Sequence, residues 1–250
     1  MSFIKIRLFI ISLLSSTVIL FSSCSGLKNS NVKTKASNDI LVLLVGGGSS
    51  HDFDKWYKQV DVQTLMNASN IKVDYVDDVS QILHFLPNVD VLFLTNNQPI
   101  SDTATREAIL SFVDSGKGLV LGHAALWYNW EDWPEYNKLL VSGGSRGHDA
   151  YGGFDVKVLE KNHPVTEGVP ESFHLKDELY YFKEDSAGPG IEVLATANRA
   201  GSTEVFPSVF VVKNPNARIV GIALGHDAES HELKAYQSLL INAIKWVARK

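Results

Sequence analysis

Short runs of apolar residues alternate with amphipathic segments through most of this chain. Continuous or alternating apolar runs predict strands at residues 40–45, 71–76, 89–94 and 119–121. Apolar positions three or four residues apart predict helices between them, at residues 54–68, at residues 79–86, and from Ser101 or Asp102 to Gly116. This β-α-β-α-β order predicts a parallel sheet joined by right-handed crossovers.

The second half of the chain is richer in strands. Apolar runs predict strands at residues 154–159, 191–195, 206–212 and 219–224, and an amphipathic helix at residues 233–247. The Gly-rich segment 143–149 is predicted to be a flexible loop. The whole pattern predicts an α/β domain with a mostly parallel central sheet, helices on both faces and a β-rich C-terminal half.

The first residues have the pattern of an export signal. Lys5 and Arg7 precede an apolar stretch, residues 8–21, that is too short for a comfortable transmembrane helix and typical of a signal sequence. A polar segment with several lysines and asparagines follows and is typical of a flexible tether. We therefore expect the folded domain to begin after this tether.

The residues between signal and tether carry a candidate modification site. Phe21-Ser22-Ser23-Cys24 resembles a bacterial lipobox, in which the cysteine is lipidated after cleavage, although Phe21 departs from the usual aliphatic residue. We expect a lipid anchor at Cys24 and a location in the bacterial cell envelope, on the periplasmic side or the cell surface. An ordinary cleaved signal followed by an incidental cysteine is the alternative. The expected segments are a signal peptide (1–23), the lipidated cysteine and tether (24–38) and the domain (39–250).

Composition and charge narrow the range of partners. The chain is 45% hydrophobic and 20% charged, as in ordinary globular proteins, and its formal net charge is -5. A mildly acidic chain without a basic run is not expected to bind nucleic acid. Cys24 is the single cysteine, so no internal disulfide is expected.

Histidines follow the carboxyl ends of several predicted strands. His51 follows the first strand, His123 the central strand and His226 the last strand. Because ligands bind outside the carboxyl ends of strands in open α/β sheets, we expect these histidines and His148 to converge on one pocket. The glycines at 46–48 are interpreted as room for the backbone to approach a ligand. The alternative for His123 is a structural role at the strand end.

Two kinds of chemistry fit these side chains. One is a divalent metal site of two or three histidines and a carboxylate, which leaves a position for water or a sugar oxygen; its candidate histidine ligands are His51, His123, His148 and His226. The other is metal-free proton transfer next to a ketone; the candidate catalytic residues are His123, His226, Asp227 and Glu178. His84 and His231 lie on predicted helices and are expected to be structural or exposed, and His163 is expected to fix a turn.

A cluster of aromatic residues follows His123, with polar residues between the rings. Rings beside carboxylates suit the apolar face and the hydroxyl groups of a sugar, although such rings pack equally well in a core. The candidate substrate-binding residues are His51, Asp52, Trp127, Trp130, Trp133, His148 and Tyr180.

The motifs together carry a resemblance to a known family. Residues 46–52, 118–124, 143–148, 163–164, 177–180 and 225–227, in this order and spacing, resemble the ThuA-like family, named for trehalose utilisation. The resemblance implies the flavodoxin-like fold of class I glutamine amidotransferases, a three-layer sandwich. It also implies a role in carbohydrate catabolism on disaccharides or glycosides, such as 3-keto derivatives, by hydrolysis or by lyase or isomerase chemistry. A non-catalytic carbohydrate-binding lipoprotein and a scaffold component of an envelope complex remain as alternatives.

The amidotransferase comparison has a consequence for chemistry. The segment Gly118 to His123 resembles the nucleophile motif of that class, with Val120 in the cysteine position, or with His123 or Ala124 there if the motif is shifted. No alignment places a thiol at this point, because Cys24 is the single cysteine. We therefore expect that the protein is not a glutamine amidotransferase.

Overall fold

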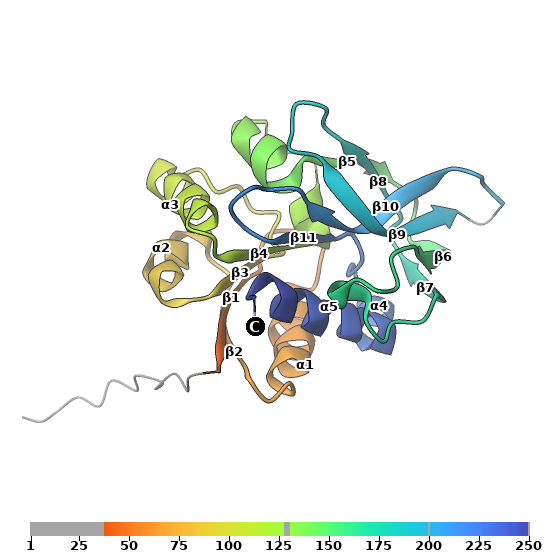
Figure 1. Cartoon of the computed structure of the whole chain (residues 1–250), viewed down its shortest axis with the longest axis horizontal. Helices are drawn as coiled ribbons and strands as arrows, with labels where there is room; N and C mark the ends of the chain where they lie inside the picture. Colours follow the sequence, from red (N-terminus) through yellow and green to blue (C-terminus); the bar gives the residue numbers. More distant parts are fainter. Residues whose placement is uncertain (1–37, 128–130, 200, 250) are drawn as a thin grey trace, which may run out of the picture. The chain divides into compact units, whose positions relative to one another are not determined.

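The computed structural model describes residues 38–127, 131–199 and 201–249 (Figure 1). The predictions that lie outside these residues are the signal peptide, the lipidation of Cys24, the tether up to residue 37 and the contact of Trp130 with a sugar. Within the described ranges, no helix combines the length and the apolar character that a membrane span requires.

A nine-stranded sheet with the order β2-β1-β3-β4-β11-β10-β9-β6-β7 forms the centre of the domain. The strands β2, β1, β3, β4 and β11 are parallel, and the remaining pairs are antiparallel. The prediction of an α/β fold with a parallel central sheet and a strand-rich second half is confirmed. The strands are β1 (Ile40–Val45), β2 (Ile71–Val76), β3 (Val91–Leu94), β4 (Gly118–Gly122), β6 (Gly152–Val158), β7 (Ser172–Asp177), β9 (Ile191–Arg199), β10 (Val205–Val212) and β11 (Ile219–Ile222).

Helices cover both faces of the sheet because its strands are apolar on both sides. Along β1, Val42 and Leu44 pack into one hydrophobic cluster, and Leu43 and Val45 pack into the other. Figure 1 shows α1, α4 and α5 on one side of the sheet, with α2 and α3 on the other. The helices are η1 (a π-helix, Asp54–Asp61), α1 (Val62–Met66), η2 (Val79–Gln81), α2 (Ile82–Phe85), η3 (Leu86–Asn88), α3 (Thr103–Asp114), η4 (His123–Leu126), η5 (a π-helix, Tyr136–Val141), η6 (Pro164–Thr166), α4 (Ala228–Glu232) and α5 (Lys234–Val247).

The segment predicted to be a flexible loop is a strand. Residues Gly143–His148 form β5, which pairs with β8 (Tyr180–Glu184) in a separate two-stranded sheet. A Cβ atom on Gly143 would collide with the backbone of Lys183, and the φ angle of Gly143 is 153°. The glycines at this position therefore allow two strands to approach closely, rather than making the chain mobile.

A buried ion pair lies under the loop that carries His226. His231 and Asp61 are both fully buried, and the Nδ1 atom of His231 is 2.8 Å from the Asp61 carboxylate. The Nε2 atom of His231 donates to the carbonyl of Gly225 at 3.0 Å, and Tyr236 donates to Asp61 at 3.1 Å. Because both ring nitrogens face acceptors, this arrangement favours the charged imidazolium. His231, predicted to be structural or exposed, is a structural core residue.

The His231–Asp61 pair gives folding a defined pH dependence. Burial alone would lower the pKa of His231, but the neighbouring Asp61 carboxylate reverses this and raises the pKa above 6.5. When the pKa of a group is higher in the folded state than in the unfolded state, its contribution to stability is fully present below the pKa of the unfolded state. The contribution is lost as the pH rises through the pKa of the folded state. We expect His231→Gln to cost about 3–5 kcal/mol at low pH, with a cost that shrinks as the pH rises above 6.5.

Urea unfolding of both proteins from pH 5.5 to pH 9 measures this difference. The exposed His84 on α2 supplies the control, His84→Gln, for which we expect no such trend. A difference between wild type and His231→Gln that stays constant with pH would contradict the charged pair.

Candidate functional site

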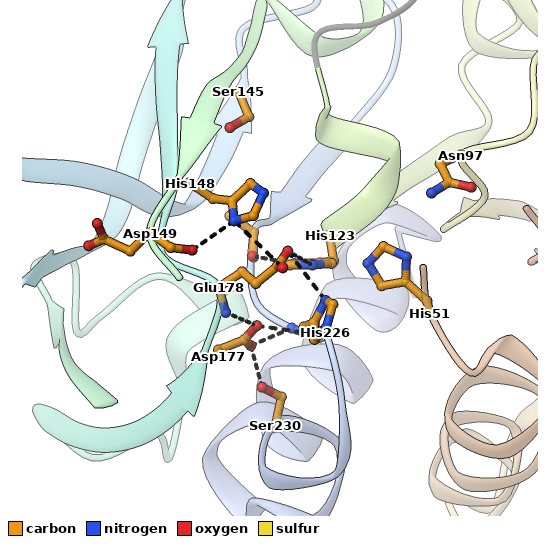
Figure 2. Close-up of polar contacts among 12 residues, drawn as sticks. His51, Asn97, His123, Ser145, His148, Asp149, Asp177, Glu178, His226 and Ser230 are labelled. Carbon is orange, nitrogen blue, oxygen red and sulfur yellow. Dashed lines mark hydrogen bonds and ion pairs between the residues drawn. The ribbon is translucent and has the colours of Figure 1, made fainter. Parts of the chain in front are cut away.

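Four neighbouring parallel strands end at one edge of the sheet, and their loops form the site. The order β1-β3-β4-β11 brings together the residues that follow each strand, although they are far apart in the chain. Figure 2 shows His51, His123 and His226 around the carboxylate of Glu178, with His148 beside it. The ring centroid of His51 is 5.1 Å from that of His123 and 4.7 Å from that of His226. The histidines that the sequence places at strand ends therefore lie together at this edge.

His123 occupies the sharp turn after β4. Its φ angle is 30°, a value that non-glycine residues rarely adopt, and its side chain is fully buried. Val120, by contrast, lies inside β4 and packs in the core. Of the positions considered for a nucleophile turn, His123 is the one at the sharp turn, and its side chain is an imidazole and not a thiol. Strained backbone of this kind persists where the surrounding structure enforces it, which is typical of functional sites.

The loop after β1 is held by the loop after β3. Asn97 accepts a hydrogen bond from the backbone N–H of Ser49 at 2.9 Å and donates to the Ser49 carbonyl at 2.8 Å. That carbonyl also accepts from Nδ1 of His51 at 3.0 Å. A Cβ atom on Gly48, whose φ angle is 130°, would collide with Asn97. Gly48 therefore makes room for the adjacent loop. That the glycines of this loop also let the backbone approach a ligand stays a prediction.

Glu178 reaches the site from the turn between β7 and β8, and Asp177 anchors that turn. Asp177 is fully buried and accepts hydrogen bonds from the backbone N–H groups of Gly225 at 2.8 Å and of His226 at 3.2 Å. It also accepts from the hydroxyl of Ser230 and from the N–H of Glu178. One carboxylate thus fixes both the loop that carries His226 and the residue that carries the second carboxylate (Figure 2).

The nitrogen and oxygen atoms at the centre of the site are close together but not hydrogen-bonded to one another. Oε2 of Glu178 is 3.6 Å from Nε2 of His123 and 3.3 Å from Nδ1 of His226, and its Oε1 is 3.5 Å from Nδ1 of His148. One ligand atom from each of His51, His123, Glu178 and His226 lies within 4.8 Å of the others. Among the described residues, the buried atoms His51 Nε2, His123 Nε2 and His226 Nδ1 have no hydrogen-bond partner.

The electrostatics favour an ionised carboxylate and a neutral His51. Burial, followed by the proximity of His123, lowers the pKa of His51 to about 4. Burial would raise the pKa of Glu178, but His123 and His226 beside it outweigh this and hold that pKa below its usual range. Glu178 in turn raises the pKa of His226. The site therefore carries a fixed negative charge surrounded by imidazoles.

A cavity of about 450 Å³ opens above this cluster. Trp127 and His148 pack edge to face at 5.4 Å between ring centroids, and Tyr180 stacks on His123 at 4.2 Å. A volume of this size suits a small ligand, and the mixture of rings and polar groups suits one with both apolar and hydroxyl faces. The cavity is lined by Ser49, Ser50, His51, Asn97, Ala124, Trp127, His148, Glu178, Tyr180 and His226.

Three other candidate residues lie elsewhere. Asp52 caps the turn at Lys55 through the backbone N–H of that residue, at 3.0 Å. Asp227 caps α4 and accepts a hydrogen bond from Tyr151 at 2.7 Å. Both carboxylates accept backbone hydrogen bonds, and neither residue is among those that line the cavity, so no contact with a ligand in this cavity is assigned to them.

Trp133 also lies away from the cavity. It is 3% exposed, packs against Tyr136 at 5.2 Å between ring centroids and contacts the guanidinium of Arg106. It therefore belongs to the hydrophobic core and not to a sugar-binding surface. Asn97, Ser49 and Ser50 also line the cavity, although they are not among the predicted site residues. Ser49 and Ser50 belong to the motif at residues 46–52, and Asn97 follows the carboxyl end of β3, which is the signal that could have found them.

Comparison with known proteins assigns the family. Residues 41–247 match the family described as ThuA, trehalose utilisation. The chain belongs to the ThuA family. Membership supports a carbohydrate-related role. No curated protein matches the chain.

Solved structures agree with this assignment. A ThuA-like protein from Parabacteroides merdae is 26% identical, with 84% of this chain and 90% of that chain covered and a TM-score of 0.73. A ThuA-like protein from Bacteroides uniformis is 23% identical, with 86% and 94% covered and a TM-score of 0.70. The glutaminase domain of CTPS from Trypanosoma brucei, with bound acivicin, is 13% identical, with 84% and 94% covered and a TM-score of 0.50. The last likeness concerns the fold, which is glutamine amidotransferase-like.

The ThuA-family chain is expected to lack glutaminase activity, because His123 stands at the nucleophile turn and Cys24 is the single cysteine. Hydrolysis of glutamine by this class needs a thiolate at that turn. Ammonia release from glutamine by the purified protein should not exceed that of a heat-inactivated sample. A rate above that background would contradict the prediction.

Proposed function

We propose that this ThuA-family chain is an enzyme of carbohydrate catabolism that acts on a disaccharide or glycoside derivative, such as a 3-keto sugar. The observation that carries the proposal is the composition of the cavity, where Trp127 and Tyr180 lie beside Glu178 and His148. Aromatic rings bind the apolar face of a sugar ring, and the polar groups bind or activate its oxygen atoms.

The reaction of a 3-keto sugar needs the kinds of groups that this cavity contains. In a 3-keto glycoside, the C2 proton is acidified by the neighbouring ketone, and the glycosidic oxygen at C1 is β to that ketone. A base can remove the C2 proton, the released electron pair forms a C1–C2 double bond, and the C1–O bond breaks. The departing oxygen takes up a proton, and addition of water to C1 would complete hydrolysis. The chemistry therefore needs a positioned proton-transfer group and an electrostatic environment that supports an enolate.

His148 is the residue placed to exchange this proton. Its side chain is 34% exposed, against 20% for His226 and 0% for His123, so it reaches both the cavity and solvent. Its Nδ1 donates to the Asp149 carbonyl at 2.7 Å, which fixes the ring and leaves Nε2 as the free nitrogen. Trp127 packs against the same ring and limits its rotation.

A substrate panel tests the proposal. The purified full-length protein is incubated with glucosides, trehalose and other disaccharides, and with the 3-keto form of each, and the products are followed by mass spectrometry and NMR. We expect turnover of at least one keto sugar and a loss of about 10²-fold or more in His148→Ala. The exposed His174 on β7 provides the control variant, His174→Ala. Binding of a sugar without any turnover would instead favour a carbohydrate-binding lipoprotein.

We also propose that the protein is anchored to the bacterial cell envelope through a lipid on Cys24. The proposal rests on the lipobox-like segment Phe21-Ser22-Ser23-Cys24 after an apolar signal sequence. Cys24→Ser should move the protein from the membrane fraction to the soluble fraction, because without the thioether-linked lipid no anchor remains. Fractionation followed by mass spectrometry of the N-terminal peptide measures both location and lipid. A variant that stays with the membrane, and a wild type without lipid, would contradict the anchor.

A further inference from the structure

We propose that His51, His123, His226 and Glu178 bind one divalent transition-metal ion at the floor of the cavity. These side chains come from three strand-end loops and the β7–β8 turn, and their ligand atoms lie within 4.8 Å of one another. The argument rests on the orientation of the ring nitrogens, on their lack of other partners and on the distances to the carboxylate.

In two of the three rings, those of His51 and His123, a hydrogen bond fixes which nitrogen faces the centre. Nδ1 of His51 is 3.0 Å from the Ser49 carbonyl, and Nδ1 of His123 is 2.9 Å from the Ala223 carbonyl. A carbonyl oxygen accepts but does not donate, so both Nδ1 atoms carry the proton. Nε2 of each ring is then left with a lone pair, which is the form that a metal ligand requires.

The three ring nitrogens at the centre have no hydrogen-bond partner in the described part of the chain. Nε2 of His51, Nε2 of His123 and Nδ1 of His226 are all buried and lack a hydrogen-bond partner. A buried polar atom without a hydrogen-bond partner costs free energy. Three such nitrogen atoms at one place therefore indicate a binding site for an ion. An ion pair between Glu178 and His226 alone would leave the two Nε2 atoms unexplained, whereas a metal ion uses all three.

The spacing of the donors matches a coordination sphere. For a tetrahedral ion with ligands at about 2.0–2.2 Å, neighbouring ligand atoms are roughly 3.3–3.5 Å apart. Oε2 of Glu178 is 3.3 Å from Nδ1 of His226 and 3.6 Å from Nε2 of His123. Small side-chain rotations would bring the set to that geometry.

The donor set also indicates the class of metal. Three imidazole nitrogens and one carboxylate suit zinc, manganese, iron or cobalt, whereas magnesium and calcium prefer oxygen ligands. One side of the cluster faces the cavity, so water or a substrate oxygen has access to a further coordination position.

A supporting shell orients each ligand. Asn97 holds the Ser49 carbonyl that fixes His51, and Asp177 holds the backbone N–H groups of His226 and Glu178. Such outer partners are typical of metal sites and raise affinity by keeping the ligands in place. His148 differs, because its Nδ1 is used by the Asp149 carbonyl and it lies beside the outer oxygen of Glu178. Of the four candidate histidines, His148 is therefore left out of the proposed ligand set, and Glu178 supplies the carboxylate.

Metal titration tests the site without reference to any sugar. Untagged full-length protein is stripped with a chelator, freed of it by gel filtration, and titrated calorimetrically with Zn²⁺, Mn²⁺ and Co²⁺. We expect one equivalent of at least one of these ions per chain, and for Co²⁺ a visible absorption band from nitrogen ligation. His226→Ala and Glu178→Gln should each lower the affinity by about 100-fold or more.

Three controls make the result decisive. His174→Ala, which changes an exposed histidine, should bind metal as the wild type does, and Cys24→Ser should keep the same stoichiometry. Metal should raise the melting temperature of the wild type but not that of Glu178→Gln, a variant that keeps the shape of the side chain. The absence of binding by the wild type, or unchanged affinity in both site variants, would overturn the proposal. Because the titration uses no sugar, its outcome does not depend on the substrate panel. The metal site and the proposed function can therefore fail separately.

Discussion

His123→Ala combined with His226→Ala is expected to abolish turnover, with a fall of about 10³-fold or more in kcat/KM. Both rings face Glu178 at the floor of the cavity, and each supplies one of the donor atoms that lie within 4.8 Å of one another. Because the groups of one site act as a unit, each single variant should lose nearly as much activity as the double variant. The measurement is the rate with the keto sugar that the panel identifies.

We expect the double variant to keep its fold, so that the loss of activity is not a result of unfolding. The core consists of the apolar clusters on the two faces of the sheet, and neither His123 nor His226 belongs to these clusters. Far-UV circular dichroism of the double variant should match the wild type. Full activity in the double variant would show that the histidine cluster is not the site of the reaction.

Asp177→Ala is expected to lower the free energy of unfolding by about 3–5 kcal/mol. The carboxylate is fully buried and satisfies the N–H groups of Gly225, His226 and Glu178 as well as the Ser230 hydroxyl. Its removal leaves these donors buried without an acceptor, at about 1–3 kcal/mol for each donor that water cannot reach. Turnover should fall as well, because two residues of the site lose their anchor.

Chemical denaturation and kinetics together measure this effect. Asp155 on β6 gives a matched control, because it is exposed and pairs with the exposed His174 at 2.9 Å. Asp155→Ala should change the free energy of unfolding by no more than roughly 0.5 kcal/mol. If Asp177→Ala unfolded at the same denaturant concentration as the wild type, the role of this carboxylate as an anchor would be wrong.

The strands and the strand-end histidines could be predicted from the sequence because both depend on local patterns. Apolar runs such as Ile40–Val45 mark buried strands, and the geometry of parallel sheets places the residues after each strand at a common edge. The alternating pattern of residues 71–76 predicts a strand near the edge of the sheet, and β2 is the edge strand. The short-range signals of the capping residue Asp102 and of Gly116 likewise agree with the limits of α3.

The parts that could not be predicted depend on partners distant in the chain. β5 looks like a loop in isolation, since its pairing with β8 is set by residues about 40 positions later. The same holds for Asn97, whose amide matters because it holds the loop of Ser49, 48 positions earlier. Trp133 is among the predicted sugar-binding residues but is buried in the core. The residues next to an aromatic residue in the sequence do not reveal whether its ring faces the core or a cavity.

The position of β11 between β4 and β10 has a consequence for biosynthesis. The chain leaves the sheet after Gly122 and returns to pair with β4 only at β11, and the ring of His123 is fixed by a carbonyl 100 positions later. A nascent chain therefore cannot complete the central pairing, or close the cavity, until almost all of it has been synthesised. Long-range pairing of this kind slows folding, since the intervening loop must close first. A polypeptide truncated before β11 would expose the edge of β4, and such an unpaired central strand invites aggregation.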